Sequence, residues 1–284
     1  MPARVLTLLA LLLALVAVGQ AHAAEPSQPP VRSWACYYGA KPIASLTRFD
    51  LLALESSNLP APAKRKGRPL SLGYASLGEV DMDGRFWGDV QDKPFVLGKN
   101  NSWNSRFVDI RDPAWRAFVL ERILPPILER GYDGFFLDTL DSSIHLEQTD
   151  PERHAGMIDA AVEFVREIRR RHPGVLLCVN RAAPILERLA PEIDFTLLEC
   201  LFSDYDFETK KYRATSASDR DQLLGAARAA KRANPRLTLL SLDYADPKDA
   251  KRIDEAIAHA RKNGLVPYVA TVALDRVSTR TLRR

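Results

Sequence analysis

The sequence predicts an α/β fold, a single-domain (β/α)8 TIM barrel. Eight short apolar runs of strand length recur along the chain, and helical patterns lie between several of them. Continuous apolar strands alternating with helices are typical of a parallel sheet whose faces are covered by helices. Eight such units in about 250 residues favour a closed barrel over an open doubly wound sheet.

The eight expected strands share a length of five to ten residues and an almost continuous apolar character. They cover residues 33–38, 51–55, 70–79, 134–138, 175–180, 195–199, 238–243 and 266–271.

The expected helices have recognisable first and last residues. Asp150–Pro151 resembles an N-cap followed by Pro at the first helical position, and Pro173–Gly174 would end that helix. Ser218–Asp221 resembles a capping box, and a further helix is expected from Asp246–Pro247 to Gly264. We also expect a helix over residues 114–130 with a break at Pro125–Pro126.

Two connections depart from the regular pattern. Residues 58–69 are expected to form a loop where the second unit would have its helix. The connection over residues 81–112 is long and rich in aromatic and polar side chains. Long βα loops at the mouth of a barrel are usually functional.

The N-terminus predicts export from the cytoplasm. Arg4, the apolar run 5–18 and the Ala-x-Ala sequence ending at Ala23 form the pattern of a secretory signal peptide. The apolar run is shorter than a spanning helix needs, and no second run is long enough. We therefore expect a signal peptide over residues 1–23, a linker over 24–32 and the barrel over 33–284, in a periplasmic or secreted protein without membrane attachment after cleavage.

Composition excludes several other classes of protein. A net charge of +4 does not indicate nucleic-acid binding, and the five scattered histidines predict no metal site. Three cysteines are too few for a disulfide scaffold. Cys36, Cys178 and Cys200 lie in apolar segments, so they are expected as buried small hydrophobic residues, with one disulfide plus a free thiol as the alternative.

Carboxylates collect at the ends of the expected strands, where a barrel enzyme carries its chemistry. A single one could cap a helix or pair with Arg181, but a buried ring of carboxylates is costly unless it is functional. Five of the eight strands end in this way, at Glu55, Glu79, Asp138, Glu199 and Asp243.

Two of these carboxylates suit the cleavage of a glycosidic bond, which needs a pair of them. Asp138 and Glu199 lie two strands apart, so their carboxyl groups could approach to about 5–9 Å. That range covers both the retaining and the inverting geometry. Aromatic side chains near the mouth could stack on sugar rings, and the acidic surroundings would favour a cationic amino sugar. These aromatic residues are Tyr38, Trp87, Trp103, Tyr205 and Tyr244.

Three sequence segments resemble a known family. GYDGFFLDTLD (131–141), YASLGE (74–79) and LLECLF (197–202) are similar to the endo-α-1,4-polygalactosaminidase glycoside hydrolases of family 114. The similarity is closer still to the related hydrolase domain that processes the Pel exopolysaccharide. It extends from about Trp34 to Asp275.

The resemblance implies a barrel that cleaves α-1,4-linked galactosamine or N-acetylgalactosamine polymers internally, without a metal or other cofactor. It places the catalytic pair on Asp138, as nucleophile or base, and Glu199, as acid/base, although the roles could be reversed. Asp141 competes for the first role. The resemblance also implies that sugar-site positions fall on Glu79, Asn180, Asp243 and Tyr244, and we add Tyr38 and Asp141 to the expected substrate-binding set. The Pel protein carries a deacetylase region after its hydrolase, so deacetylation here would need another protein.

A second function remains open at this point. A non-catalytic glycan-binding barrel that assists polysaccharide export would use the same mouth. The presence of both catalytic candidates favours the enzyme. The substrate's acetylation state, the stereochemical outcome and the oligomeric state are not fixed by the sequence.

Overall fold

The computed structural model describes residues 30–63 and 67–282. The expected signal peptide, residues 1–23, and most of the expected linker, residues 24–32, lie outside the described residues. The described residues from Val31 onward form one compact unit.

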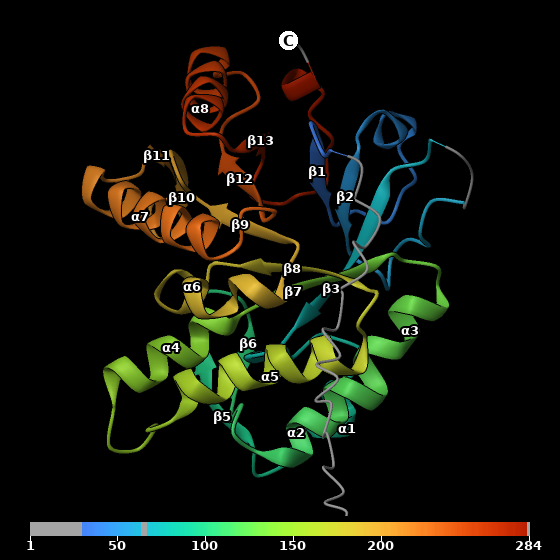
Figure 1. Cartoon of the computed structure of the whole chain (residues 1–284), viewed down its shortest axis with the longest axis vertical. Coiled ribbons are helices and arrows are strands. Elements are labelled where there is room, and N and C mark those ends of the chain that lie inside the picture. Colours follow the sequence, from blue (N-terminus) through green and yellow to red (C-terminus); the bar gives the residue numbers. More distant parts are fainter. Residues whose placement is uncertain (1–29, 64–66, 283–284) are drawn as a thin grey trace, which may run out of the picture. The chain divides into compact units, whose positions relative to one another are not determined.

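The core of this unit is a sheet of eight parallel strands with helices packed around it (Figure 1). The sheet closes nearly to a barrel, because Trp34 Nε1 donates to the carbonyl of Val266 (2.9 Å) between the first and last strands. The amide of Tyr38 likewise donates to Leu274 (2.8 Å). The predicted (β/α)8 barrel is confirmed. In order around the sheet the strands are β1 (Trp34–Tyr37), β2 (Leu51–Leu54), β3 (Leu70–Ser76), β7 (Gly134–Asp138), β8 (Leu176–Asn180), β9 (Phe195–Glu199), β12 (Thr238–Tyr244) and β13 (Val266–Ala270).

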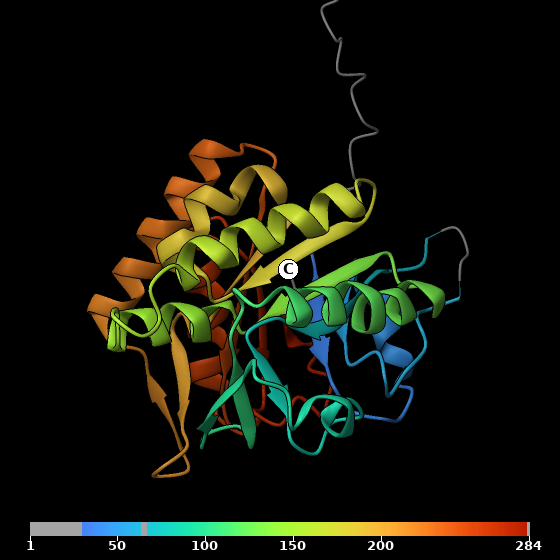
Figure 2. The same cartoon turned by 90° about the horizontal axis from the view of Figure 1, so that it is seen from below.

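The strands form here because their side chains are buried on both faces. Every residue of β1 and β2 is buried, and β12 is buried from its second residue onward. One face of each strand fills the barrel interior and the other packs under the helices, which explains the continuous apolar runs in the sequence. The helices lie outside the strands (Figure 2). They are α2 (Pro113–Phe118), α3 (Leu124–Glu129), α4 (Leu140–Thr149), α5 (Met157–Arg171), α6 (Leu186–Leu189), α7 (Ala217–Ala233) and α8 (Ala250–Lys262).

Three predicted helix starts are wrong by two to six residues. Asp150 follows α4, which was not predicted, and its carboxylate accepts from the Arg153 amide within a turn, so α5 begins only at Met157. The cap of α7 is Ser216, which accepts from the Asp219 amide. For α8 the cap is Asp249, because Asp246–Pro247 forms the turn before it. At each of these starts the sequence holds more than one residue of a type that favours the N-cap position, so the sequence alone does not show which one is the cap.

The break predicted at Pro125–Pro126 lies a few residues earlier. A π-helical turn over Val119–Ile123 separates α2 from α3. Both prolines lie in the first turn of α3. The backbone amides of a first turn have no partner within the helix, so the lack of an amide hydrogen in proline costs no hydrogen bond there. In the second unit, residues 58–63 and 67–69 contain no helix, as the sequence indicated.

The third predicted strand is divided in two. It ends at Ser76, and Glu79–Asp81 forms a separate strand, β4, because the chain turns sharply at Gly78. A Cβ atom at Gly78 would lie only 2.1 Å from the Thr139 carbonyl oxygen, so only glycine fits this close approach. The prediction of one continuous strand over 70–79 is therefore corrected.

Two small sheets are inserted beyond the carboxyl ends of the barrel strands (Figure 2). In the first, β4 and β5 (Val96–Asn100) both pair with β6 (Ser105–Val108), and a short helix, α1 (Trp87–Val90), precedes β5. The second is a hairpin of β10 (Ser203–Asp206) and β11 (Lys211–Ala214). The first explains the long connection seen in the sequence; the second was not predicted.

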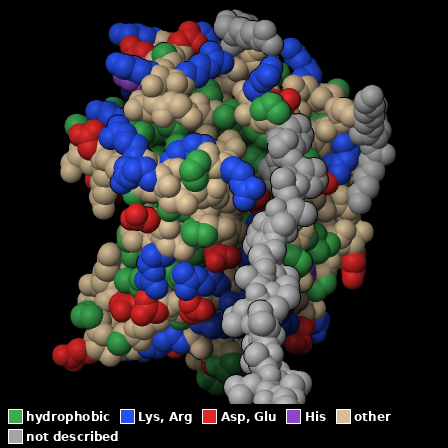
Figure 3. Space-filling view, viewed as in Figure 1, with side chains coloured by type: hydrophobic (Ala, Val, Ile, Leu, Met, Phe, Trp, Pro, Cys, Tyr) green, Lys and Arg blue, Asp and Glu red, His purple; other side chains and the backbone are tan. Residues whose placement is uncertain are grey.

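The surface carries mixed charges. On the face shown in Figure 3, basic and acidic side chains are interspersed. Among the described residues, no helix combines the length and apolar character needed to cross a membrane. Cys36 and Cys178 are buried and Cys200 is half-buried; all three are free thiols.

Candidate active site

A cavity of about 730 Å³ opens at the carboxyl end of the barrel. Parallel strands all place their carboxyl ends at the same mouth, so side chains from distant parts of the sequence converge there. Every barrel strand contributes a residue at or just after its end: Tyr38, Glu55, Ser76, Asp138, Asn180, Glu199, Tyr244 and Val272.

Asp138 and Glu199 meet at this mouth through Asn180. The Asn180 Nδ2 atom donates to Asp138 Oδ1 (2.9 Å) and to Glu199 Oε2 (2.8 Å). The two acceptor oxygens are therefore no farther apart than the sum of these distances, 5.7 Å. This upper limit lies below the 6.5–9.5 Å of inverting glycosidases and is compatible with the spacing of about 5–5.5 Å in retaining ones.

Further donors surround the pair. The Tyr244 hydroxyl donates to Glu199 Oε1 (2.7 Å), and the Thr139 amide donates to Asp138 Oδ1 (2.8 Å). Burial raises the pKa of Asp138 to about 7, helped by the charges of Glu199 and Asp141, whereas the bonds from Thr139 and Asn180 act the other way.

The backbone turns sharply after three neighbouring strands. Thr139, Arg181 and Cys200 directly follow the last residues of β7, β8 and β9, and their φ angles are 65°, 52° and 56°. A left-handed conformation costs a residue with a side chain about 1–3 kcal/mol and persists where surrounding bonds impose it, often at active sites. At Thr139 those bonds come from the amides of Leu77 and Gly78 to its Oγ1.

Asp141 lies in the first turn of α4 and borders the same cavity. Its carboxylate contacts Arg181 Nε at 3.3 Å. Burial raises the pKa of Asp141, and Arg181 opposes that change. Asp141 is therefore paired with a cation, whereas Asp138 shares the Asn180 amide with Glu199.

Glu79 borders the cavity, but its oxygens are used within the protein. It accepts from Asn100 Nδ2 (3.0 Å) and from the hydroxyls of Ser105 and Ser142. These partners join the inserted sheet to α4. Glu79 therefore fixes the wall of the cavity from β4, not from the end of a barrel strand.

Asp243 does not line the cavity, contrary to the sequence prediction. Side chains alternate along β12, so Leu242 and Tyr244 face the cavity and Asp243 faces the opposite side. Its side chain is fully buried and accepts from the amides of Phe202 (2.6 Å) and Ser203 (2.9 Å), while Oδ2 has no partner. Burial raises its pKa to about 7. Asp243 holds the segment that follows Glu199.

The aromatic predictions are met in part. Tyr38, Trp103, Tyr205 and Tyr244 border the cavity, whereas Trp87 lies in α1 outside it. Sequence reasoning missed Tyr74, inside β3, and Phe207, at the tip of the β10–β11 hairpin. The alternation of β3 could have indicated Tyr74; no pattern in the sequence indicated the hairpin.

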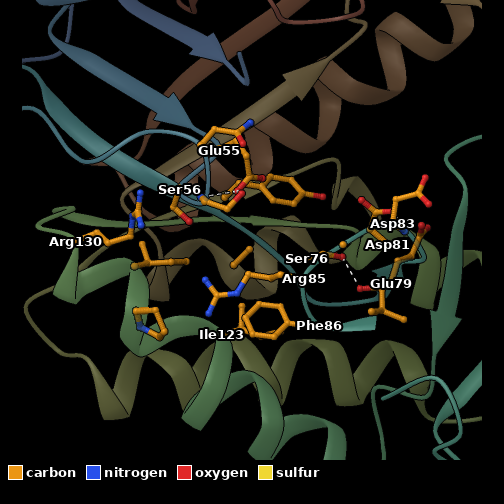
Figure 4. A pocket seen from close by; sticks show the side chains of 18 of the residues that line it. Glu55, Ser56, Ser76, Glu79, Asp81, Asp83, Arg85, Phe86, Ile123 and Arg130 are labelled. Carbon is orange, nitrogen blue, oxygen red and sulfur yellow. Dashed lines mark hydrogen bonds between the residues drawn. The ribbon is translucent and has the colours of Figure 1, made fainter. Parts of the chain in front are cut away.

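A second cavity, of about 390 Å³, is drawn in Figure 4. Glu55, Ser76, Glu79 and Asp81 border both cavities, so the two lie side by side. The outer wall of the second cavity comes from α3 and the segment 83–86, beside the unit that lacks a helix.

An eight-stranded barrel with two hydrogen-bonded carboxyl groups at its mouth, in an open cleft lined by aromatic rings, has the architecture of a glycoside-cleaving enzyme. Comparison with known proteins agrees. The family model of glycoside-hydrolase family GH114 matches residues 16–283, and the chain belongs to this family. The protein is a glycoside hydrolase.

Two solved structures are similar to the chain. The glycoside hydrolase domain of PelA from Pseudomonas aeruginosa has 32% sequence identity and a TM-score of 0.75, over 87% of this chain and 98% of that one. Aspergillus fumigatus Ega3, solved in complex with galactosamine, has 14% identity and a TM-score of 0.64, over 87% and 94%; this likeness concerns the fold. No curated protein sequence matches significantly.

We expect the substitution Asp243→Asn to change how stability depends on pH. The folded-state pKa of about 7 lies above the unfolded value of about 3.9, so the stability that this carboxyl contributes is full below pH 4 and is lost as pH rises through 7. Asparagine lacks this contribution. The difference in Tm between wild type and variant should therefore move in the variant's favour from pH 4 to pH 8.

Thermal unfolding over that pH range measures the effect. Asp159→Asn, at an exposed position on α5, is the matched control and should follow wild type. A wild-type-to-variant difference that stays constant with pH would contradict the assignment to Asp243.

Proposed function

We propose that the protein is a periplasmic or secreted endo-acting hydrolase of an α-1,4-linked galactosamine/N-acetylgalactosamine exopolysaccharide. In this proposal Asp138 and Glu199 are the catalytic pair. The observation that carries it is the bond from one Asn180 nitrogen to both carboxyl groups. Supporting this substrate class are the similarity to the hydrolase domain of PelA and the galactosamine complex of Ega3.

The charge of the cleft favours a partly deacetylated polymer. Eight carboxyl groups border the larger cavity, against two cationic side chains, Arg181 and Arg213. A cleft with such an excess of one charge concentrates ligands of the opposite charge, such as the ammonium groups of galactosamine. The carboxyl groups are Glu55, Glu79, Asp81, Asp138, Asp141, Glu199, Asp204 and Asp206.

The spacing of the pair suits a retaining mechanism. Asp138 attacks the anomeric carbon while Glu199 donates its proton to the departing glycosidic oxygen, which leaves a glycosyl ester on Asp138. Glu199 then takes a proton from water, whose oxygen displaces Asp138 from the sugar. Asn180 keeps the two carboxyl groups at a fixed separation, and Tyr244 orients Glu199 through both steps.

Asp138 suits the nucleophile because its short side chain is fixed by the amide of the next residue. Glu199 has the longer side chain that a proton carrier needs in order to reach first the leaving oxygen and then water. The two cavities share one wall, and together they offer space for several sugar rings of a polymer.

Export rests on the N-terminal apolar run, which has the pattern of a cleaved signal peptide. In the periplasm or outside the cell the enzyme would meet the polymer, and its partners would be proteins that export or modify the polysaccharide.

Removal of either carboxyl group should abolish catalysis. We expect Asp138→Asn and Glu199→Gln each to lower the release of reducing ends from partly acetylated α-1,4-galactosaminogalactan and from Pel by at least about 10³-fold. Asp159→Asn and Glu163→Gln make the same chemical changes at exposed positions on α5 and should leave release unaltered.

Two results would count against this assignment. Full activity of Asp138→Asn would transfer its role to Asp141. Absence of release by wild type, together with binding of the polymer, would mean that the mouth binds glycan without cleaving it.

The pH profile should show a limb near neutrality. Burial raises the pKa of Asp138 to about 7, and this carboxyl group must be ionised to attack the anomeric carbon. We expect kcat/KM to fall roughly tenfold for each pH unit below this value. Initial rates from pH 4 to 9 measure it; a rate that does not fall between pH 7 and pH 5 would contradict the role of Asp138 as the nucleophile.

A further inference from the structure

Two exposed aromatic rings meet across the rim of the cleft. Trp103 and Phe207 are 54% and 44% exposed, and they are the two large apolar side chains with such exposure in the described part of the chain. Their ring centroids lie 4.7 Å apart with the planes at 74°, an edge-on contact. Both border the larger cavity.

The two rings come from different inserted sheets. Trp103 lies in the turn between β5 and β6, and Phe207 lies just after β10. The contact therefore joins the tips of two insertions that the barrel itself does not need. Contiguous exposed apolar surface in a protein generally marks a binding site.

A series of aromatic contacts supports Phe207 from behind. It meets the Tyr205 ring edge-on at 5.2 Å, and Tyr205 meets Tyr212 at 5.1 Å from the neighbouring strand β11. Tyr205 borders the cavity and Tyr212 does not, so the series runs from the cleft into the hairpin. Rings braced in this way lose little conformational entropy when they bind a ligand.

The turn that carries Trp103 is also fixed. Asn104 has a left-handed backbone, with φ at 53°. Its Nδ2 atom donates to Asp83 Oδ2 (2.7 Å), and its carbonyl accepts from the Met82 amide (3.1 Å). These bonds hold Trp103 at the rim instead of letting it fold back onto the protein.

Carboxylates lie beside the aromatic rings. Asp204 and Asp206 border the cavity from β10, on the same hairpin as Phe207. Both pair with Arg213, at 3.0 and 3.3 Å, so the three side chains together keep one negative charge. An aromatic face next to carboxylates suits an amino sugar, whose ring stacks on the indole and whose ammonium group is attracted both to the π face and to the acids.

We propose that Trp103, braced by Phe207, is a stacking subsite for a sugar ring of the polymer beyond the bond that is cleaved. This inference rests on the proposed polysaccharide hydrolase function. Trp103 and Phe207 lie on inserted sheets, whereas the catalytic candidates lie on barrel strands. Only a glycan long enough to extend from the pair to the rim engages the subsite, so Trp103 sets the preference for long chains.

Kinetics with substrates of different length test this subsite. Trp103→Ala should raise KM for the polymer roughly 3- to 10-fold, with kcat changed by less than about twofold. Trp103→Phe, which retains an aromatic face, should recover most of the affinity. Trp87→Phe, outside the cavity, is the matched control and should behave as wild type.

Equal KM values for wild type and Trp103→Ala would overturn the subsite. So would an equal rise in KM for a disaccharide, which fills only the two positions on either side of the cleaved bond, because such a rise would indicate a general disturbance of the cleft. If wild type releases no reducing ends at all, the proposed function fails, and binding decides the subsite separately.

Fluorescence measures that binding. Trp34 and Trp115 are buried and Trp87 is half-buried, so Trp103 is the tryptophan most accessible to iodide. In the Glu199→Gln background, adding the partly deacetylated polymer should protect tryptophan emission from iodide quenching. The protection should disappear when Trp103→Phe is added; protection that persists would overturn the proposal.

Discussion

One amide nitrogen, Asn180 Nδ2, organises the mouth of this barrel. It bonds two half-buried carboxyl groups that would otherwise repel each other, and it holds the two accepting oxygens within 5.7 Å of each other. Both groups sit at the ends of strands, and Arg181, directly after β8, is a cation whose charge interacts with both of them. The burial of the pair is tolerable because donors from Asn180, Thr139 and Tyr244 converge on it.

The rest of the structure keeps those donors in place. The residues directly after β7, β8 and β9 have a left-handed backbone conformation. They turn the chain immediately after Asp138, Asn180 and Glu199, the polar residues that end these strands. Asp243, on the far face of β12, ties down the segment after Glu199, and Glu79 ties the inserted sheet to α4. The two inserted sheets carry the aromatic rings of Trp103 and Phe207 at the rim of the cleft.

The sequence predicted the barrel well because buried parallel strands are continuous apolar runs that end in polar residues. The positions of Asp138, Asn180 and Glu199 followed directly from that pattern. The prediction for Asp243 was wrong because a carboxylate at the end of a strand can point to either face of the sheet. Tyr244 faces the cavity, so its neighbour Asp243 on β12 points to the opposite face. Asp150 was misplaced because a turn and a helix cap prefer the same residue type. The contact of Trp103 with Phe207 joins segments about 100 residues apart, so no local sequence pattern indicates it.

The chemical role of Asp138 is tested most directly by trapping the glycosyl–enzyme ester. An oligosaccharyl fluoride of the substrate needs no acid to depart, so the Glu199→Gln variant should form the ester and then fail to hydrolyse it. Peptide mass spectrometry of the quenched reaction should find the sugar on the peptide that contains residues 134–141, with fragmentation assigning it to Asp138. A sugar attached to Asp141, or no adduct while an inverted product accumulates, would contradict the assignment of Asp138 as the nucleophile.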